Sequence, residues 1–273
     1  MKKIEFDFDK GMIKFFAFLF MVIVLISMIS FFVEAVIPSG AQVTQISNST
    51  GPSDPAGSSQ AVAGNVTELN LYGYTSTQSW QGYYGNVTGT IQLSDGGDNV
   101  LYNWSDMNPK GEIYASTSNS VSWTDIQCFN FTAKGTFAND SANRGGTSKY
   151  GLNLTQLETN FSIPFNSVDS VNNTFNLSGP GNHATFYTNN LEFADGTCQS
   201  TRLYTNLGKG VSGDFEEVLL YDPLSRNVVY TSLLNQNILG FDNRTHDFEM
   251  VVPEDGHGTN TATTSYYFYV ELQ

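Results

Sequence analysis

Residues 216–234 read EEVLLYDPLSRNVVYTSLL, and this stretch decides the fold class. Its outer parts, EEVLLY and NVVYTSLL, are rich in Val, Leu and Tyr, whereas DPLSR between them consists mainly of turn-forming residues. Two apolar runs joined by a short turn predict an antiparallel β-hairpin. The chain is therefore expected to build at least part of its core from strands.

Residues 87–104 follow the same pattern. In VTGTIQL, the side chains of Val87, Gly89, Ile91 and Leu93 share one face of a strand, which predicts that the strand is half-buried. SDGGD then forms a turn, and NVLYNW returns as the second strand. The final run, SYYFYVEL, is so apolar that we expect it to lie inside a sheet.

Similar runs recur along the chain, and turn residues separate them at the spacing expected of a sandwich or barrel. The sequence predicts one short helix at 152–161. Residues 65–273 are therefore expected to form a mainly β ectodomain, an antiparallel β-sandwich of jelly-roll-like form. The predicted strands are 67–72, 86–93, 99–105, 111–116, 121–131, 170–176, 183–193, 197–205, 214–222, 227–234, 247–252 and 265–272.

The N-terminal part has a different character. Phe15–Val33 reads FFAFLFMVIVLISMISFFV without a charge, and as a helix it would be roughly 28 Å long, about the thickness of a bilayer's hydrocarbon core. We predict a transmembrane helix or signal anchor over 15–35, with membrane lipid as its partner. Its length exceeds that of ordinary cleaved signal sequences, which favours retention.

The positive charges predict the orientation of this segment. The next Lys or Arg after the apolar run is Lys110. By the positive-inside rule, residues 1–14 are cytoplasmic and the rest of the chain is extracellular, so the protein is expected in the cell membrane. Four lysines precede the apolar run, at positions Lys2, Lys3, Lys10 and Lys14.

A polar stretch follows the apolar segment. Residues 38–64 read PSGAQVTQISNSTGPSDPAGSSQAVAG, which is rich in Pro, Gly and Ser and has no periodicity. We predict a flexible linker over 36–64, acting as a stalk for the β domain.

The charge balance excludes one class of function. The chain of 273 residues has a formal net charge of −14, and residues 1–34 carry no net charge, so the excess lies on the exported part. An acidic surface argues against nucleic-acid binding. Asp95 and Asp98 are predicted to be turn residues and not part of an EF-hand. The sequence predicts neither a metal site nor a cofactor.

The two cysteines, Cys128 and Cys198, both follow the membrane segment. In an oxidising compartment such a pair predicts a disulfide. The alternative is two separate buried thiols. Neither Cys has another Cys or a His at ligand spacing, which argues against a metal site.

Eleven N-x-[ST] sequons lie after the membrane segment, and their asparagines are predicted glycosylation sites. In several of them the middle residue is apolar. On a strand this would place the asparagine outside and its neighbour in the core. The alternative is a chain that is merely rich in Asn and Thr. The asparagines are Asn48, Asn65, Asn86, Asn103, Asn130, Asn139, Asn153, Asn160, Asn172, Asn176 and Asn243.

No catalytic motif marks the chain as an enzyme. It contains neither H-E-x-x-H nor G-x-S-x-G, and its three exported histidines are far apart in sequence. Glu216 and Glu217 would point to opposite faces of a strand, so they cannot act as a glycosidase pair. Glycines 208, 210 and 213 have dinucleotide-motif spacing, but a strand pattern follows them where a helix is required.

An aromatic stretch raises the possibility of sugar binding. Trp80, Tyr83 and Tyr84 lie in WQGYYGN and could stack on sugars, although a role in the core is favoured. No catalytic residue is therefore predicted, and the protein is not expected to be an enzyme.

Several phrases resemble a known group of proteins when taken together. They are WQGYYGNVTGTIQL, NVLYNW, TCQSTRLYTN, FEEVLLYD, NVVYTSLL, HDFEMVVPEDGHGT and TSYYFYVEL. The chain resembles uncharacterised archaeal cell-surface proteins that combine an N-terminal membrane segment with a β-rich exterior. The resemblance covers most of residues 79–272 and implies an archaeal envelope, without an activity.

These observations lead to one main hypothesis and two alternatives. The main one is a membrane-anchored extracellular cell-envelope glycoprotein with a structural or adhesive role, whose partners include copies of itself or other envelope proteins. The first alternative is a type IV pilin-like filament subunit processed after Gly11, although Lys14 would then be buried in the filament core. The second is a secreted carbohydrate-binding protein.

Overall fold

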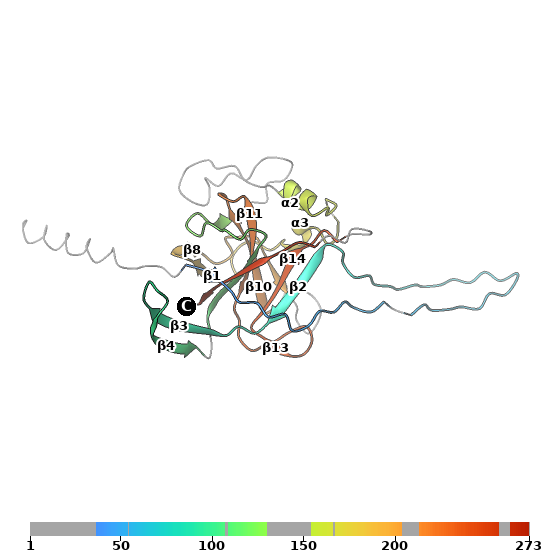
Figure 1. Ribbon diagram of the computed structural model, residues 1–273. Coiled ribbons are helices and arrows are strands. Elements are labelled where there is room, and N and C mark those ends of the chain that lie inside the picture. Colours follow the sequence, from blue (N-terminus) through green and yellow to red (C-terminus); the bar gives the residue numbers. More distant parts are fainter. Residues whose placement is uncertain are drawn as a thin grey trace, which may run out of the picture. The chain divides into compact units, whose positions relative to one another are not determined.

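The computed structural model describes residues 37–53, 55–106, 109–129, 154–165, 167–203, 213–256 and 263–272 (Figure 1). This part of the chain is mainly β, and all of its strand pairs are antiparallel. Predictions for residues 1–36 lie outside the described residues. Within the described ranges, no helix has the length and apolar character needed to cross a membrane.

The hairpin predicted at 216–234 is the centre of the main sheet. Strand β10 (Phe215–Asp222) pairs with β11 (Asn227–Leu233), and their register runs from Glu217 opposite Ser232 to Asp222 opposite Asn227. Asp222 stabilises the turn, because its carboxylate accepts hydrogen bonds from the Leu224 amide at 2.9 Å and the Ser225 hydroxyl at 2.6 Å. The predicted hairpin is confirmed.

A seven-stranded sheet surrounds this hairpin. Its order is β1 (Ser39–Gly40), β15 (Tyr267–Leu272), β5 (Gly111–Ser116), β11, β10 and β6 (Gln127–Cys128). Strand β9 (Ser200–Leu203) also pairs with β10. The C-terminal run lies between β1 and β5, which confirms that it is inside a sheet.

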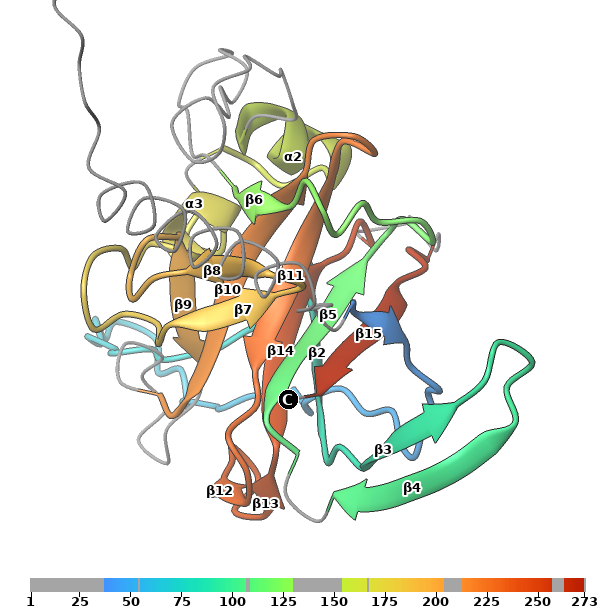
Figure 2. The ribbon, with the colours of Figure 1, turned by 90° about the vertical axis from the view of Figure 1, so that its left-hand side faces the viewer.

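Both faces of the main sheet are covered (Figure 2). On one face lies a ribbon of β2 (Trp80–Gly85) and β14 (Phe248–Pro253), which contributes Met250 and Val252 to a core with Leu219 and Tyr221. On the other face lies a hairpin of β7 (Phe186–Thr188) and β8 (Leu191–Phe193). Strand β10 is therefore almost continuously buried, which explains why its sequence lacks strict alternation.

Two short helices pack on the first of these faces. Helix α2 (Leu154–Asn160) confirms the predicted helix, and its Leu154 and Leu157 enter the core. The strand predicted at 170–176 is wrong, because helix α3 (Val171–Thr174) forms there. Its N-cap is Ser170, whose hydroxyl accepts a hydrogen bond from the Asn173 amide at 3.2 Å. This local cap outweighs the strand-like spacing of the apolar residues.

Other predicted boundaries also change. No strand forms at 67–72, where the chain is extended and exposed. Strands β2, β12 (Ile238–Leu239) and β13 (Thr245–His246) were not predicted. Of the predicted strand at 121–131, only β6 has strand pairing among the described residues.

The predicted linker does not simply precede the β domain. Its first part forms β1, in which Ser39 lies opposite Val270 and Gly40 opposite Tyr269. We call residues 42–78 the arm, because they leave the main sheet after β1 and lead to β2, which pairs with β14 in a separate two-stranded sheet. The described residues of the arm are exposed and contain neither helix nor strand. Figure 1 draws the arm as two extended legs, which a hydrogen bond from the Tyr74 hydroxyl to the Pro52 carbonyl links at 3.1 Å.

The hairpin predicted at residues 87–104 is confirmed, but the prediction that one of its faces is buried is not. Strand β3 (Gly89–Ser94) pairs with β4 (Val100–Asp106), and Asp95 closes the turn by accepting hydrogen bonds from the Gly97 and Asn99 amides at 2.9 Å. Ile91 and Leu93 are exposed, so the prediction of a half-buried strand is wrong. The two strands form a sheet of their own, with no further strand beside them among the described residues.

Candidate functional site

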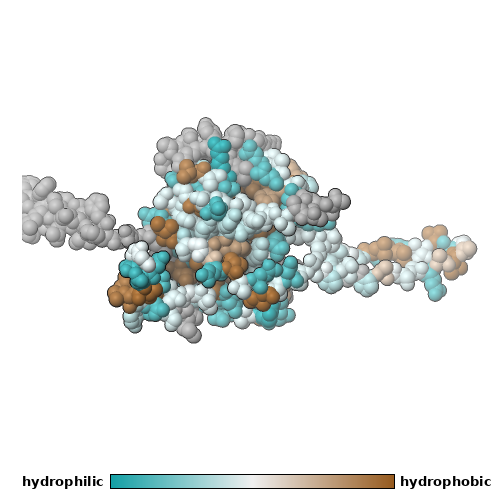
Figure 3. Space-filling view, viewed as in Figure 1, coloured by the Kyte–Doolittle hydropathy of each residue, from teal (hydrophilic) through white to brown (hydrophobic). Residues whose placement is uncertain are grey.

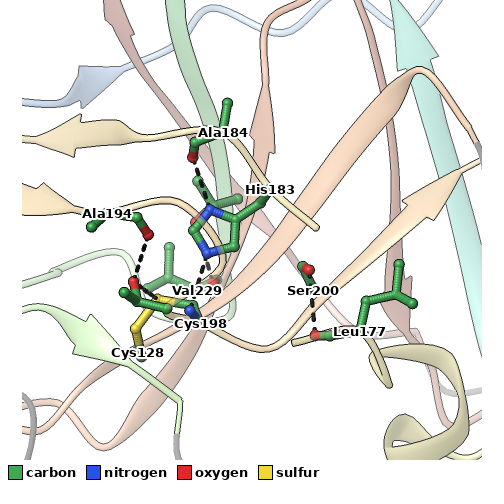
Figure 4. Close-up of a disulfide and its surroundings, with 10 residues drawn as sticks. Cys128, Leu177, His183, Ala184, Ala194, Cys198, Ser200 and Val229 are labelled. Atoms are coloured by element: carbon green, nitrogen blue, oxygen red, sulfur yellow. Dashed lines mark hydrogen bonds between the residues drawn. A yellow bond between two sulfur atoms is a disulfide. The ribbon is translucent and has the colours of Figure 1, made fainter. Parts of the chain in front are cut away.

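A disulfide joins Cys128 to Cys198, as predicted (Figure 4). Cys128 lies in β6 opposite Leu220, and Cys198 lies two residues before β9, whose Ser200 is opposite Val218. Strands β6 and β9 are therefore neighbours along one edge of β10, and the disulfide ties them together. It closes a loop of 70 residues, which stabilises the fold by about 4 kcal/mol in the chain-entropy model.

A buried histidine holds the turn beside this disulfide. His183 is fully buried, with its Nδ1 2.8 Å from the Ala184 carbonyl and its Nε2 3.0 Å from the Cys198 amide (Figure 4). The Cys198 N–H can only donate, so Nε2 accepts and Nδ1 carries the proton. The histidine is neutral in this arrangement, and its role is to position Cys198.

The predicted acceptor asparagines have one property in common. Among the described residues, eight of them are exposed, and none of their side-chain amides makes a hydrogen bond. A free, exposed amide is what a glycan acceptor requires. Asn130, Asn139 and Asn153 lie outside the described residues. The eight exposed asparagines are Asn48, Asn65, Asn86, Asn103, Asn160, Asn172, Asn176 and Asn243.

The strand geometry predicted for these sequons holds only in part. Only Asn103 lies within a strand, and its neighbour Trp104 is exposed instead of buried. Asn160 ends α2, and its neighbour Phe161 does pack against the core. The other described asparagines lie in loops, in α3 or on the arm. Loops and helix ends expose asparagine as well as a strand does, and local sequence did not distinguish them.

An ion-paired turn presents one of these acceptors. Between β12 and β13, Asp242 accepts hydrogen bonds from Arg244 at 2.6 Å and from the ring of His246 at 2.8 Å. Desolvation opposes ionisation of Asp242, but these two hydrogen bonds lower its pKa to about 2. Asn243 lies between the paired residues with a positive φ of 60°. The charges therefore stabilise a tight turn with Asn243 on the outside.

A pair of buried glutamates lies beneath the β7–β8 hairpin. Glu112 and Glu271 stand opposite each other in β5 and β15, and both are buried. Glu271 accepts hydrogen bonds from the Tyr114 hydroxyl at 3.0 Å and from the Asn189 amide. Burial, and then the charge of Glu271, raise the pKa of Glu112 to about 8. Glu112 is therefore protonated at neutral pH. Burial also raises the pKa of Glu271, and the hydrogen bonds from Asn189 and Tyr114 only partly oppose this rise.

A third carboxyl group lies on the opposite face of the main sheet. Glu217 is fully buried, and burial raises its pKa well above the usual value. Its Oε2 accepts a hydrogen bond from the Val251 amide at 2.8 Å. Its neighbour Glu216 pairs instead with Arg202 at 2.6 Å. The two glutamates thus point to opposite faces, as the strand pattern predicted.

These carboxyl groups do not form a site that a substrate can reach. Glu112, Glu271 and Glu217 are each at most 4% exposed. The residues that the structure describes contain no group of three or more His, Cys, Asp or Glu side chains able to hold a metal ion. The arrangement therefore supports packing and sensitivity to pH.

The aromatic residues of WQGYYGN mainly stabilise the fold. Trp80 and Tyr83 pack against the core, and the Trp80 indole donates a hydrogen bond to the Asp169 carbonyl at 2.6 Å. Tyr84 contacts the rings of Phe241 and His246, with centroids 4.8 and 4.7 Å away. These contacts favour the core interpretation for Trp80 and Tyr83, whereas Tyr84 lies in an exposed aromatic cluster.

An open groove of about 430 Å³ lies along β15 and β1. The hydroxyl groups of Tyr266 and Tyr269 are already used, because they donate to the carbonyls of Pro253 at 2.7 Å and Ser118 at 3.0 Å. The groove thus offers aromatic surface but few free polar groups for a sugar. Its lining is Gly40, Ala41, Val43, Asn119, Tyr266, Tyr267, Phe268 and Tyr269.

Comparison with known proteins gives no relative. The chain matches no family model, no curated protein and no solved structure. The resemblance to archaeal cell-surface proteins therefore stays a prediction, and the functional argument rests on the residues themselves. The exposed asparagines were predictable from their sequons, whereas the buried glutamates and His183 carry no local sequence signal.

Proposed function

We propose that this chain is a membrane-anchored extracellular cell-envelope glycoprotein of archaeal type, with a structural or adhesive role. The observation that carries the proposal is the set of eight exposed asparagine amides in sequons, all without a hydrogen-bond partner in the described part of the chain. The Cys128–Cys198 disulfide supports an oxidising, extracellular environment. The apolar segment Phe15–Val33 supports attachment to the membrane.

The β domain is proposed to act as a rigid head of sandwich-like or jelly-roll-like form. The packing of the β2–β14 ribbon over the seven-stranded sheet supports this form. Only residues 36–38 separate the proposed membrane segment from β1. The connection is therefore short in sequence, and the arm follows β1 instead of preceding it.

Protease treatment of intact cells tests the proposed location. We expect the protease to remove the domain after residue 36 and to leave residues 1–14 protected, because the apolar segment crosses the membrane once. The mature N-terminus, read by mass spectrometry of the same sample, is expected at residue 1. A control on lysed cells should lose both parts.

Other outcomes of this measurement would contradict the proposal. A start at Met12 would favour the filament subunit processed after Gly11. A start just after the small residues Ser39-Gly40-Ala41, which resemble a signal-cleavage site, would favour a secreted protein. Protection of the whole β domain in intact cells would place it inside the cell.

A further inference from the structure

The arm contains a strand-like segment that pairs with no strand among the described residues of its own chain. Residues 66–74 read VTELNLYGY, where Leu69 and Leu71 would share one face of a strand. Large apolar side chains are unusually exposed here, with Leu71 at 89% and Tyr72 at 91%. Isolated exposed side chains are common, but several in one short segment indicate a contact surface.

The β3–β4 hairpin also has an unpartnered apolar face. In its register Ile91 lies opposite Trp104, and Leu93 lies opposite Tyr102. All four side chains are about half exposed, at 48–58%. Figure 3 shows hydrophobic surface in the region where Figure 1 labels β3 and β4.

The opposite face of this hairpin carries two polar pairs, and Leu101, beside the shift in register, is also exposed. Thr90 lies opposite Ser105, and Gln92 lies opposite the acceptor Asn103. A glycan on Asn103 would therefore project from the polar face and leave the apolar face uncovered. Among the described residues β4 has an unpaired edge, whose amide and carbonyl groups are available to a further strand.

We propose that residues 66–74 of one copy add as a β-strand to the free edge of β4 in a second copy. In this arrangement Leu69 and Leu71 extend the apolar face that Tyr102 and Trp104 begin, because both pairs have the same spacing of two residues. The added strand would also satisfy the unpaired backbone groups of β4. The inference rests on the proposed function, because a location in the cell envelope would bring copies of the chain next to one another.

The charge distribution favours a second copy over an anionic partner. Between Lys14 and Lys110 the chain has no Lys or Arg, which disfavours lipid headgroups or nucleic acid as the partner of these segments. The chain as a whole carries −14, so two copies repel each other over most of their surface. Between Asp54 and Asp95 the only charged residue is Glu68, so the arm segment and β3 belong to the least charged part of the exported chain.

Cross-linking between two tagged full-length chains tests the contact. One chain carries Leu71→Cys and the other carries Tyr102→Cys, and both are mixed in neutral detergent and oxidised. We expect a cross-linked product with both tags, several-fold above that of a control pair in which Leu224→Cys replaces Tyr102→Cys. Leu224 is also exposed but lies in the β10–β11 turn. Since the two cysteines are on different chains, the product reports contact between copies.

The mass of the assembly provides a second readout. Wild-type chains are expected to associate as concentration rises, and Leu71→Asp should shift the distribution to monomers. Ile46→Asp is the matched control, because Ile46 is an exposed apolar residue on the other leg of the arm. It should leave association unchanged.

Three results would overturn the inference. The first is equal cross-linking in the test and control pairs, and the second is a wild-type chain that stays monomeric at every concentration. The third is a double variant with both Leu71→Cys and Tyr102→Cys that cross-links only within one chain. Because the measurement uses purified chains, it gives the same answer whether or not the proposed cell location is correct.

Discussion

Replacing both cysteines, as Cys128→Ser with Cys198→Ser, is expected to lower the free energy of unfolding by about 4 kcal/mol. The disulfide closes a 70-residue loop and ties β6 to the start of β9 along the same edge of β10. Without the disulfide, only the short backbone pairings with β10 hold β6 and β9 in place. Urea denaturation of the full chain in detergent, followed by tryptophan fluorescence, measures the loss.

Reduction of the wild-type chain is the control for this experiment. It should destabilise the fold to the same extent as the double substitution, because both remove the same covalent bond. A loss below about 1 kcal/mol in both samples would contradict the structural role of the disulfide.

The Glu112→Gln variant is expected to remove a large part of the fall in stability between about pH 4.5 and pH 8. The pKa of Glu112 is raised from 4.5 to about 8 in the fold, mainly by burial and then by the charge of Glu271. Between these values the folded chain binds more protons than the unfolded chain, so stability decreases as pH rises. Each unit of this shift corresponds to about 1.4 kcal/mol.

The comparison of pH profiles is the measurement. In the wild-type protein, the contribution of Glu112 to the free energy of unfolding should be fully present below about pH 4.5. It should decrease as the pH rises and be lost above about pH 8. Glutamine has a similar shape and does not ionise, so its profile should be flatter. Glu68→Gln, on the exposed arm, is the control and should keep the wild-type slope. Identical slopes for Glu112→Gln and wild type would contradict the assignment of a buried proton to this pair.

The strand content could be predicted from the sequence, but the layering could not. The turn at Asp222 and the apolar runs on each side of it indicated a hairpin from local chemistry alone. That β10 is buried on both faces depends on β14 and on the β7–β8 hairpin, which lie far away in sequence. Local patterns do not contain such long-range contacts.

The exposed segments were the least predictable part of the fold. Residues 67–72 and 87–93 have the alternation of half-buried strands, yet the arm has no strand pairing and the face of Ile91 and Leu93 is open. The periodicity indicates that a face is suited to burial and does not identify what covers it. A partner outside the chain gives the same sequence pattern as a partner inside it.

The sequence predicted which asparagines are candidate glycosylation sites, but it predicted their structural positions only in part. The sequons identified candidate acceptors, and every described candidate is exposed. The expectation that the asparagines lie on strands holds only for Asn103, because caps and tight turns place others at α2, at α3 and beside Asp242.

Mapping of glycopeptides from the native protein shows whether its sequon asparagines carry glycans. We expect glycans on several of the eight exposed sequon asparagines, including Asn103 in β4 and Asn243 in its ion-paired turn. Asn119 is exposed but is not in a sequon, so it should be unmodified. A native protein with all eleven sequon asparagines unmodified would contradict the assignment as an envelope glycoprotein.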